Sequence, residues 1–568
     1  MLSYRKLAMR VLGRPLHTGG IDSPRPASQR AAAFILTAVM LTTLAAPAFA
    51  GTWSIENGDI TVKAGETGND VTQNNVTTKN DTDTIITNSD KDTASSHTVT
   101  IETNDKNDKV EVTLDNVNIK ADSGSALTSK GDVTLTLKGD NSLTGGNGGS
   151  GISSSGSLTI SGGENNSLTA QGGSGSGIFS SGGVTISGGT VNATGGSSSG
   201  GSDSGDGIHS GSLTISGGTV NATGGTGGTG ENSNGGSGIY IYSSSGSLTV
   251  SGGTVTANGG SGGGNGGDGI SSTNTTISGG STVTANGGNG GSLVGGDGIR
   301  SGGGLTVSDG TVTAKGGNGD SKDGYGGDGI RSGGVVTISG NTVNAAGGYG
   351  GKVGGYGICS FDRVAISGGT VEAAGGNGST GGGSGIYSSV IDLSGSLELT
   401  AKAGSPNGKA LSQNGSELVL DTIKDKLGPG AKVTATDADG KVIDQVSTPR
   451  PVEPEESSSS SDGGSATPSA PASPLPGLTV TDKDGQRISY TSTQSGNTLT
   501  VCVGRLTASL RISLAALRQM RAEGIETITF QTILCSTTLS VDELLAMGGE
   551  DAEAVLTHRF TDSSLTVG

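Results

Sequence analysis

The chain is poor in aromatic side chains and in cysteine, and both shortages restrict what it can be. Its 568 residues include 6 Phe, 8 Tyr and 1 Trp, too few to fill the cores of several conventional domains. The 3 cysteines have neither zinc-site nor redox-motif spacing. Cys502 and Cys535 lie in the same C-terminal region and are candidates for one disulfide, whereas Cys359 is interpreted as a tolerated small residue.

Positive charge and histidine are also scarce. The 34 Lys and Arg residues against 51 Asp and Glu give a formal net charge of −17, which argues against nucleic acid and anionic membrane surfaces as partners. With 4 His and no recognisable pair of catalytic carboxylates, we predict that the protein is not an enzyme. The weaker alternative is a polysaccharide lyase, for which Arg300 or Arg331, near Asp297 and Asp328, is the candidate base.

Glycine, in contrast, is abundant, with 110 residues against 13 Pro. The absence of a Gly-X-Y period excludes collagen and leaves either disorder or a repeat fold. Apolar residues recur in register along the chain, which a disordered segment has no reason to do. The composition therefore favours a repeat protein.

The N-terminus has the pattern of an export signal. Basic residues up to Arg30 precede an uncharged run, residues 31–50, that ends in Ala-Pro-Ala-Phe-Ala. This pattern predicts a signal peptide over residues 1–50, cleaved after Ala50, and a secreted, extracellular protein with no membrane insertion after cleavage. Any attachment to a cell wall is then non-covalent. An uncleaved membrane anchor is the alternative, since the run is long enough to span a bilayer.

A repeat marked by Gly-Ile runs from Ile152 to Ile386, with weaker Ala-Leu versions at Leu127 and Leu411. Its period varies from 25 residues (Leu127 to Ile152) to 31 residues (Ile208 to Ile239). The inner text of each repeat is nearly constant, and the Gly/Ser/Asn stretch that follows varies in length. Constant cores with variable loops are typical of solenoids, and we interpret the variable stretches as elastic loops.

Apolar residues alternate within each repeat, as Leu213, Ile215, Val220 and Ala222 show, which predicts short strands. Three such strands per turn predict an all-β fold, a right-handed parallel β-helix of about 11 or more rungs. At about 4.8 Å per rung, the rod is on the order of 50 Å long. We interpret the Ser-Gly-Gly and Gly-Gly pairs as corners where glycine adopts positive φ.

Composition divides the rest of the chain. We expect an N-terminal cap and first rungs over residues 51–122, the glycine-rich β-helix over 123–446, and a disordered Pro/Ser/Glu linker over 447–476. Residues 477–568 predict a small α+β module, with a turn at Asp484-Gly485 and helices capped by Ser513 and Ser540.

The position after each Gly-Ile predicts one outward column with unusual chemistry. Because aromatic rings stack on sugar faces and Arg binds carboxylates and hydroxyls, we take this column as a carbohydrate site. Its candidate residues are Phe179, His209, Tyr240, Arg300, Arg331 and Tyr387, and Ser271 and Cys359 occupy the positions between them.

Asp268, Asp297 and Asp328 stand two residues before the Ile of consecutive repeats. Stacked like charges require compensation, so either each Asp caps its own turn beside an Arg or the three bind calcium, the one cofactor that the sequence suggests. Residues 263–271 match the calcium nonapeptide of bacterial toxin repeats. That motif needs tandem copies, which are absent, so we interpret the match as a by-product of glycine-rich turns.

A second outward array consists of Thr-x-Thr or Thr-x-Asn, for example at Thr254/Thr256 and Thr282/Thr284. Such a grid resembles the surface of ice-binding solenoids. The preference of strands for threonine explains it more simply.

Residues 110–146, with Val-Glu-Val-Thr-Leu-Asp-Asn-Val-Asn-Ile-Lys and Gly-Asp-Val-Thr-Leu-Thr-Leu-Lys-Gly-Asp-Asn-Ser-Leu-Thr-Gly-Gly, are followed by the Gly-Ile repeats. Together they resemble a family of secreted clostridial and other Firmicutes β-helix proteins described as carbohydrate-binding domains and akin in fold to polysaccharide lyases. The resemblance covers about residues 52–420. It implies non-catalytic binding of an extracellular, plant-type polysaccharide, with calcium as a cofactor. The alternative is a structural or adhesive surface stalk that binds another surface protein.

Overall fold

The computed structural model describes residues 50–568 except 104–107, 199–202, 321, 341, 450–476, 483–485, 489, 496, 504–506, 533–535, 548–551, 560–561 and 568. Contacts divide the chain into two units, Met1–Pro454 and Glu455–Gly568. In the part of the chain that the structure describes, no helix is long and apolar enough to cross a membrane. The predicted linker, apart from residues 447–449, lies outside the described residues.

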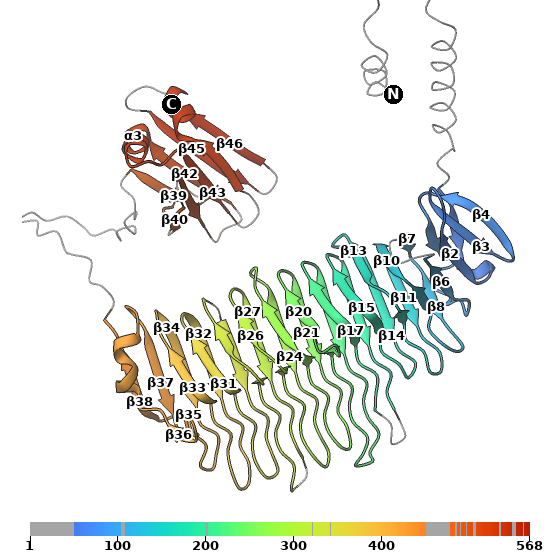
Figure 1. The fold of residues 1–568 in the computed structure, drawn as a ribbon, viewed down its shortest axis with the longest axis horizontal. Helices are drawn as coiled ribbons and strands as arrows, with labels where there is room; N and C mark the ends of the chain where they lie inside the picture. Colours follow the sequence, from blue (N-terminus) through green and yellow to red (C-terminus); the bar gives the residue numbers. More distant parts are fainter. Residues whose placement is uncertain are drawn as a thin grey trace, which may run out of the picture. The chain divides into compact units, whose positions relative to one another are not determined.

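The first unit is a parallel β-solenoid of about 14 turns, which confirms the predicted fold class (Figure 1). Each full turn contributes one strand to each of three parallel ladders. The first ladder contains the Gly-Ile strands, and the weaker markers join it in register, since Leu127 pairs with Ile152 and Ile386 with Leu411. In four turns one long strand serves both the first and the second ladder.

The strands of the first ladder are β2 (Ile60–Ala64), β6 (Val99–Glu102), β9 (Leu127–Lys130), β12 (Ile152–Ser154), β15 (Ile178–Ile186), β17 (Ile208–Ile215), β19 (Ile239–Ile241), β22 (Ile270–Ser272), β25 (Ile299–Ser301), β28 (Ile330–Ser332), β31 (Ile358–Ile366), β33 (Ile386–Leu393) and β35 (Leu411–Gln413). The second ladder uses the later parts of β15, β17, β31 and β33 together with β1 (Thr52–Ser54), β5 (Ile85–Thr87), β7 (Lys109–Asp115), β10 (Asp132–Lys138), β13 (Leu158–Gly162), β20 (Ser247–Val250), β23 (Asn274–Ile277), β26 (Leu305–Val307) and β29 (Val336–Ile338). The third ladder contains β8 (Asn118–Lys120), β11 (Asp140–Thr144), β14 (Ser167–Gln171), β16 (Thr190–Thr194), β18 (Thr219–Thr223), β21 (Thr254–Asn258), β24 (Thr282–Asn286), β27 (Thr311–Lys315), β30 (Thr342–Ala346), β32 (Gly369–Ala374), β34 (Leu397–Lys402) and β37 (Lys432–Thr436).

The core is one continuous column of apolar side chains between the ladders. Leu213, Ile215, Val220 and Ala222 are all buried in it, as the alternation predicted. No single turn could bury these side chains alone, so the stability of each turn depends on its two neighbours.

Antiparallel strands end the stack on both sides. At the N-terminal end β3 (Asn69–Gln73) pairs with β2, and β4 (Val76–Asp81) pairs with β3, beside the short 3₁₀ helix η1 (Ile55–Asn57). At the C-terminal end β36 (Ser416–Glu417) and β38 (Val442–Ser447) pair with the last parallel strands, joined by η2 (Leu420–Lys426). These strands cover the edges at which another chain could otherwise pair.

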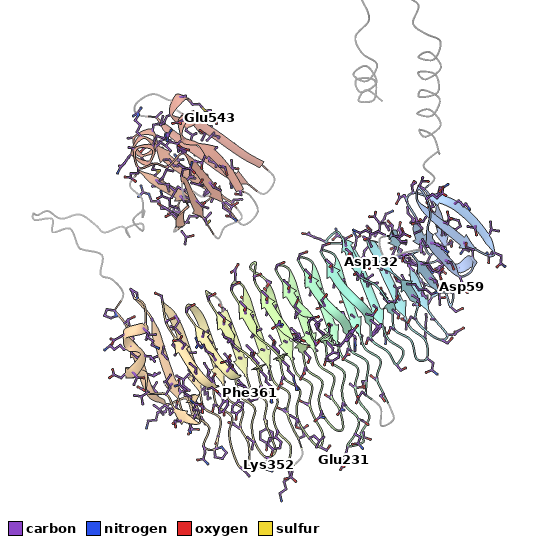
Figure 2. The ribbon with its side chains drawn as sticks, in the orientation of Figure 1. Asp59, Asp132, Glu231, Lys352, Phe361 and Glu543 are labelled. Carbon is purple, nitrogen blue, oxygen red and sulfur yellow. The ribbon has the colours of Figure 1, made fainter. Side chains whose placement is uncertain are left out.

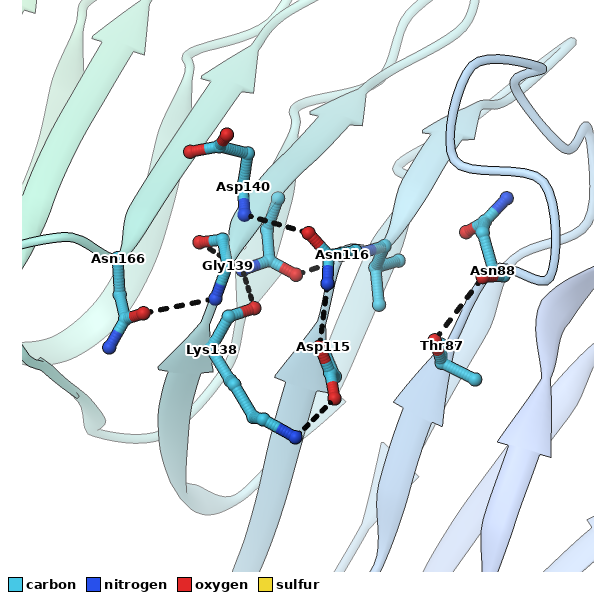
Figure 3. A network of polar contacts seen from close by, with 10 residues as sticks. Thr87, Asn88, Asp115, Asn116, Lys138, Gly139, Asp140 and Asn166 are labelled. Atoms are coloured by element: carbon cyan, nitrogen blue, oxygen red, sulfur yellow. Dashed lines mark hydrogen bonds and ion pairs between the residues drawn. The ribbon is translucent and has the colours of Figure 1, made fainter.

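Glycine with positive φ forms the corner between the second and third ladders, as predicted for Ser-Gly-Gly. Gly218 has φ +79° and Gly253 has φ +76° there. In the earlier turns asparagine also occupies this corner. Asn116, with φ 53°, accepts a hydrogen bond from the Asp140 N–H at 3.2 Å (Figure 3). The corner is therefore a stacked column in which each turn supports the next.

The Gly-Gly pairs of the long loops do not form corners, so that interpretation was wrong. The outgoing and returning legs of each loop lie so close that only backbone fits between them. Gly260 N–H donates to Gly236 O, Gly267 N–H to Gly260 O and Gly288 N–H to Gly267 O, each at 2.8 Å. A Cβ on Gly260 would lie 1.9 Å from Gly225 O. Glycine is required here by close packing and not by φ.

We call this element the glycine neck. It consists of the outgoing pairs 195–196, 224–225, 259–260, 287–288, 316–317, 347–348 and 375–376 and the returning pairs 235–236, 266–267, 295–296, 326–327, 354–355 and 382–383. Its hydrogen bonds pass alternately between the two legs from turn to turn. Figure 1 shows the loops side by side below the strands. In the described part of the chain the loops are stacked turn on turn next to the strands, and the variable length that the sequence predicted for them is confined to the segments beyond the neck.

The second unit contains two four-stranded sheets. One contains β39 (Leu478–Thr481), β42 (Ala508–Ser513), β45 (Glu553–Arg559) and β46 (Asp562–Val567), and the other β40 (Thr491–Ser495), β41 (Thr498–Cys502), β43 (Thr527–Gln531) and β44 (Ser536–Ser540). Helices α3 (Leu514–Ala522) and α4 (Val541–Met547) follow β42 and β44. Ser513 Oγ accepts from Ala516 N–H at 3.2 Å and Ser540 Oγ from Glu543 N–H at 3.4 Å, so both predicted caps are present. The predicted Asp484-Gly485 turn lies outside the described residues.

Candidate functional site

The column of residues that follows each Gly-Ile is present as a row of consecutive register partners on the first ladder. Strand pairing runs from Phe179 through His209, Tyr240, Ser271, Arg300, Arg331 and Cys359 to Tyr387. The candidates form two groups, because Ser271 separates the aromatic residues from the two arginines. Tyr387 lies beyond Cys359 and belongs to neither group.

The aromatic group is a contact cluster centred on His209. Its ring centroid lies 5.3 Å from that of Phe179, 5.0 Å from that of Tyr240 and 5.2 Å from that of Tyr242. Tyr242 was missed by the sequence reasoning, although the alternation of Ile239 and Ile241 inward places it outward. It is 43% exposed and its hydroxyl donates to Ser181 O at 2.8 Å. The cluster therefore presents fixed rings to solvent.

Asp206 fixes the orientation of the His209 ring. Its Oδ2 lies 2.8 Å from Nδ1 of His209, and its Oδ1 accepts from Ser237 N–H, in the next turn, at 2.6 Å. A carboxylate on Nδ1 favours the tautomer with the proton on that nitrogen and leaves Nε2 free to accept.

The arginine group combines charge with an aromatic face. Arg300 is exposed, and the guanidinium carbon of Arg331 lies 5.2 Å from the ring centroid of Phe361, which Figure 2 labels. Arg331 Nη1 is 3.5 Å from Asp328 Oδ2. Although burial disfavours its charged form, Asp297 and Asp328 hold the pKa of Arg331 above its usual value. Arg331 can therefore present its positive charge beside an aromatic face.

Cys359 and Tyr387 occupy the far end of the column. The Cys359 side chain is 1% exposed despite its outward position, and burial, with Asp328 nearby, raises its pKa to about 12. Tyr387 stacks on Tyr356 with ring centroids 4.9 Å apart. These residues form a separate aromatic patch, and Cys359 is neither reactive nor accessible.

The three aspartates form a ladder beside the column. Asp268 Oδ1 accepts from Asp297 N–H at 2.8 Å, Asp297 Oδ1 from Asp328 N–H at 2.7 Å, and Asp328 Oδ1 from Tyr356 N–H at 2.7 Å. Each Asp thus caps the following turn. Arg331 lies beside Asp328 of the same turn, as expected, but the backbone N–H groups that the three aspartates bind belong to the next turn and not to their own.

Burial dominates the electrostatics of this ladder. Desolvation, together with Asp328 and Asp268, raises the pKa of Asp297 well above its usual value, and desolvation raises that of Asp328 to about 6. Asp328 Oδ2 has no hydrogen-bond partner among the described residues. No group of three His, Cys, Asp or Glu side chains in the described ranges is placed to hold a metal ion. Calcium binding by Asp268, Asp297 and Asp328 stays a prediction.

The threonine grid is present on the third ladder, where Thr254, Thr282, Thr311 and Thr342 are consecutive partners. Its side chains are exposed, but nothing among them distinguishes a ligand site from an ordinary strand face. In the second unit Cys502 Sγ lies 3.6 Å from Gln531 Oε1. Cys535 lies outside the described residues, so their pairing stays a prediction.

Comparison with known proteins adds no assignment to this geometry. No family model, no curated protein and no solved structure matches the chain.

Proposed function

We propose that the protein is a non-catalytic, secreted carbohydrate-binding protein whose column on the first ladder binds an extracellular polysaccharide. The supporting observation is the cluster of Phe179, His209, Tyr240 and Tyr242, whose rings are held within 5.0–5.3 Å of His209. Fixed, partly exposed rings are the side chains that pack against sugar faces at low entropic cost.

The spacing of the column favours an extended glycan. Successive rungs are about 4.8 Å apart, close to the length of one sugar unit in an extended chain. A polysaccharide lying along the solenoid axis could place one sugar over each rung, first against the aromatic rings and then within reach of Arg300 and Arg331. Arg331 retains its proton because Asp297 and Asp328 raise its pKa, which suits it to bind hydroxyls or carboxylates and not to act as the base of a lyase.

A polysaccharide array tests this proposal with the secreted protein, two double variants and matched controls. We expect Tyr240→Ala/Tyr242→Ala and Arg300→Ala/Arg331→Ala each to lower binding at least tenfold. Lys315→Ala/Lys402→Ala removes two exposed cations from the third ladder and should leave binding unchanged. Thermal unfolding of every variant excludes loss of fold.

Each outcome of the array decides one claim. Binding that survives both column variants would place the site elsewhere, and binding to no polysaccharide would refute the function. Repeating the array with calcium and with a chelator tests whether calcium is a cofactor. The test is needed because each aspartate already uses one oxygen to accept a backbone N–H, which reduces what it can offer to an ion. Unsaturated product that absorbs in the ultraviolet after incubation with pectin would indicate a lyase instead.

The adhesive stalk is the second candidate, supported by the loop tips beyond the glycine neck. Leu293, Val294, Tyr325 and Tyr349 are exposed there. Lys352, which Figure 2 labels on the outer loops, has its Nζ 5.5 Å from the ring centroid of Tyr325. Tyr325→Ser/Tyr349→Ser should leave glycan binding unchanged. Loss of attachment of the secreted protein to a bacterial or host cell surface in this variant, with no glycan bound by the parent, would favour the stalk.

A further inference from the structure

The first described glycine of the solenoid is held by a buried carboxylate. Gly51 N–H donates to Asp81 Oδ1 at 2.8 Å, and Gly51 O accepts from Ile85 N–H at 2.9 Å. The second carboxylate oxygen, Asp81 Oδ2, accepts from the indole Nε1 of Trp53 at 2.8 Å. Both Gly51 and Asp81 are buried, whereas Ala50 is exposed. The chain therefore enters the fold at the Ala50–Gly51 bond.

This buried carboxylate is held by neutral donors. Asp81 is 0% exposed and forms no ion pair with a Lys, Arg or His among the residues that the structure describes. Its other donor is the N–H of Asp83, at 3.3 Å. N–H donors offset much of the cost of burying a carboxylate, and a positive charge on one of the donor groups would stabilise the anion further.

The sequence supplies a source for that charge. Ala-Phe-Ala immediately precedes Gly51 and has the small-x-small pattern at which export signals are cut. Hydrolysis of the Ala50–Gly51 bond adds water: the hydroxyl goes to the Ala50 carbonyl carbon and the hydrogen to the Gly51 nitrogen. At neutral pH the new carboxyl loses a proton and the new amine gains one. The nitrogen that now lies 2.8 Å from Asp81 then carries a full positive charge.

We propose that export processing completes the fold: a signal peptidase cleaves after Ala50, and the α-ammonium group of Gly51 forms a buried ion pair with Asp81. The site is built for an unsubstituted glycine. A Cβ at position 51 would lie 2.6 Å from both Asp81 Oδ2 and Trp53 Nε1. Before cleavage the same nitrogen is a neutral amide, so the precursor has the less stable N-terminal end. This proposal is independent of the carbohydrate site.

The charges that surround Asp81 are mainly negative. Asp108, Lys109 and Glu111 line a pocket of about 260 Å³ with Asp81, so that one cation shares this pocket with three carboxylates. Asp70, on β3, accepts from Asn80 N–H at 3.3 Å. The remaining charges near Asp81 are thus mainly negative, which favours an added cation.

The first test is the N-terminus of the exported protein. The full chain is expressed in a secreting bacterium, and the protein in the medium is sequenced from its N-terminus. We expect Gly51 as the first residue. Another first residue would overturn the proposal.

The second test is a stability cycle at pH 7 on the processed chain, which starts at Gly51, and on an extended chain, which starts at Ala48. We expect the processed chain to melt higher by roughly 2–5 °C, because only it carries the ion pair. Asp81→Asn should remove this difference, whereas Asp83→Asn, which changes an exposed carboxylate, should leave it. A difference that persists in Asp81→Asn contradicts the ion pair.

The third test does not require a variant to fold. Trp53 is the only tryptophan of the chain, so its emission reports this site alone. Raising the pH from about 7 to 10 removes the proton of an α-amino group, and the ion pair with it. In the processed chain we expect the Trp53 emission to shift and the melting temperature to fall over this range. In the extended chain we expect neither change. The α-amine should also react with an acylating reagent at pH 7 at least tenfold more slowly than in the denatured chain. Equal rates would contradict burial of the group.

Discussion

Oδ2 of Asp206 lies 2.8 Å from Nδ1 of His209, so that a carboxylate from the returning leg of the loop sets the plane of the ring on which Phe179, Tyr240 and Tyr242 converge. The loop layer and the strand layer are thus joined at the candidate site. Binding at the column should depend on residues that never touch the ligand.

Asp206→Asn tests this dependence. The amide still accepts the Ser237 N–H through its oxygen, but the carboxylate that orients His209 is lost. We expect glycan affinity to fall roughly 3–10-fold, less than in Tyr240→Ala/Tyr242→Ala, because only the ring orientation changes. Titration calorimetry measures the affinity. An affinity equal to that of the parent would show that Asp206 is merely a turn cap.

A methyl group in the glycine neck should be strongly destabilising. Gly288→Ala places a Cβ 2.0 Å from Gly260 O, a contact that the backbone cannot relieve without breaking the neck. We expect a loss of about 3 kcal/mol or more in the free energy of unfolding. Gly302→Ala is the control, since its Cβ would find its nearest neighbour, Ser272 O, at 3.8 Å. Thermal denaturation compares the two, and similar losses would contradict the close-packing explanation.

The aspartate ladder predicts an unusual dependence of stability on pH. A carboxyl whose folded pKa is raised binds its proton more tightly in the folded state, so its contribution is fully present below the unfolded pKa and is lost as the pH rises through the folded one. For Asp328 the window runs from 3.8 to about 6, and the raised pKa of Asp297 acts in the same direction.

Asp328→Asn should therefore raise the melting temperature at pH 7 relative to the parent and lose this advantage by about pH 4, since the amide resembles the protonated acid. Loss of the contact with Arg331 acts in the opposite direction but is partly exposed to solvent. Melting curves from pH 4 to pH 7 measure the difference between the two proteins. If Asp328→Asn melts below the parent protein at pH 7, the ionised form of Asp328 is stabilising.

The cap of α3 gives a prediction for the second unit. Ser513→Ala removes the oxygen that accepts from Ala516 N–H and should cost about 1 kcal/mol, with faster hydrogen exchange in α3. Ser513→Asp, which retains an acceptor, should restore protection. Hydrogen exchange of the solenoid ladders serves as the internal reference and should not change.

The periodic part of the fold was predictable from the sequence because its signals are local. Alternation around Leu213 and Ile215 gives the strands, and recurrence of Gly-Ile gives the ladder on which Phe179, His209 and Tyr240 are partners. Tyr242 could have been found by the same alternation, applied two residues further along.

Contacts between turns were not predictable in this way. Gly253 and Gly260 look alike in the sequence, yet the first has φ +76° and the second packs against Gly225 O. Cys359 has an outward position, but its neighbours cover it. Asp81 and Gly51 carry no shared motif, and only the stacking of turns brings them together. The repeated sequence predicts which residues each turn contains, but it does not predict which atoms of the next turn those residues contact.

The glycine neck has a consequence for how this chain can change. Residues 226–234, 261–265, 289–294 and 318–325 differ in length and composition, yet the glycine pairs on either side of each segment keep the same hydrogen bonds. The neck therefore separates the variable tips from the strands. Insertions beyond it should alter neither the core nor the register of the strands, so that the tips can gain new surface, within the limits of their pairing with neighbouring tips, while the column on the first ladder stays as it is.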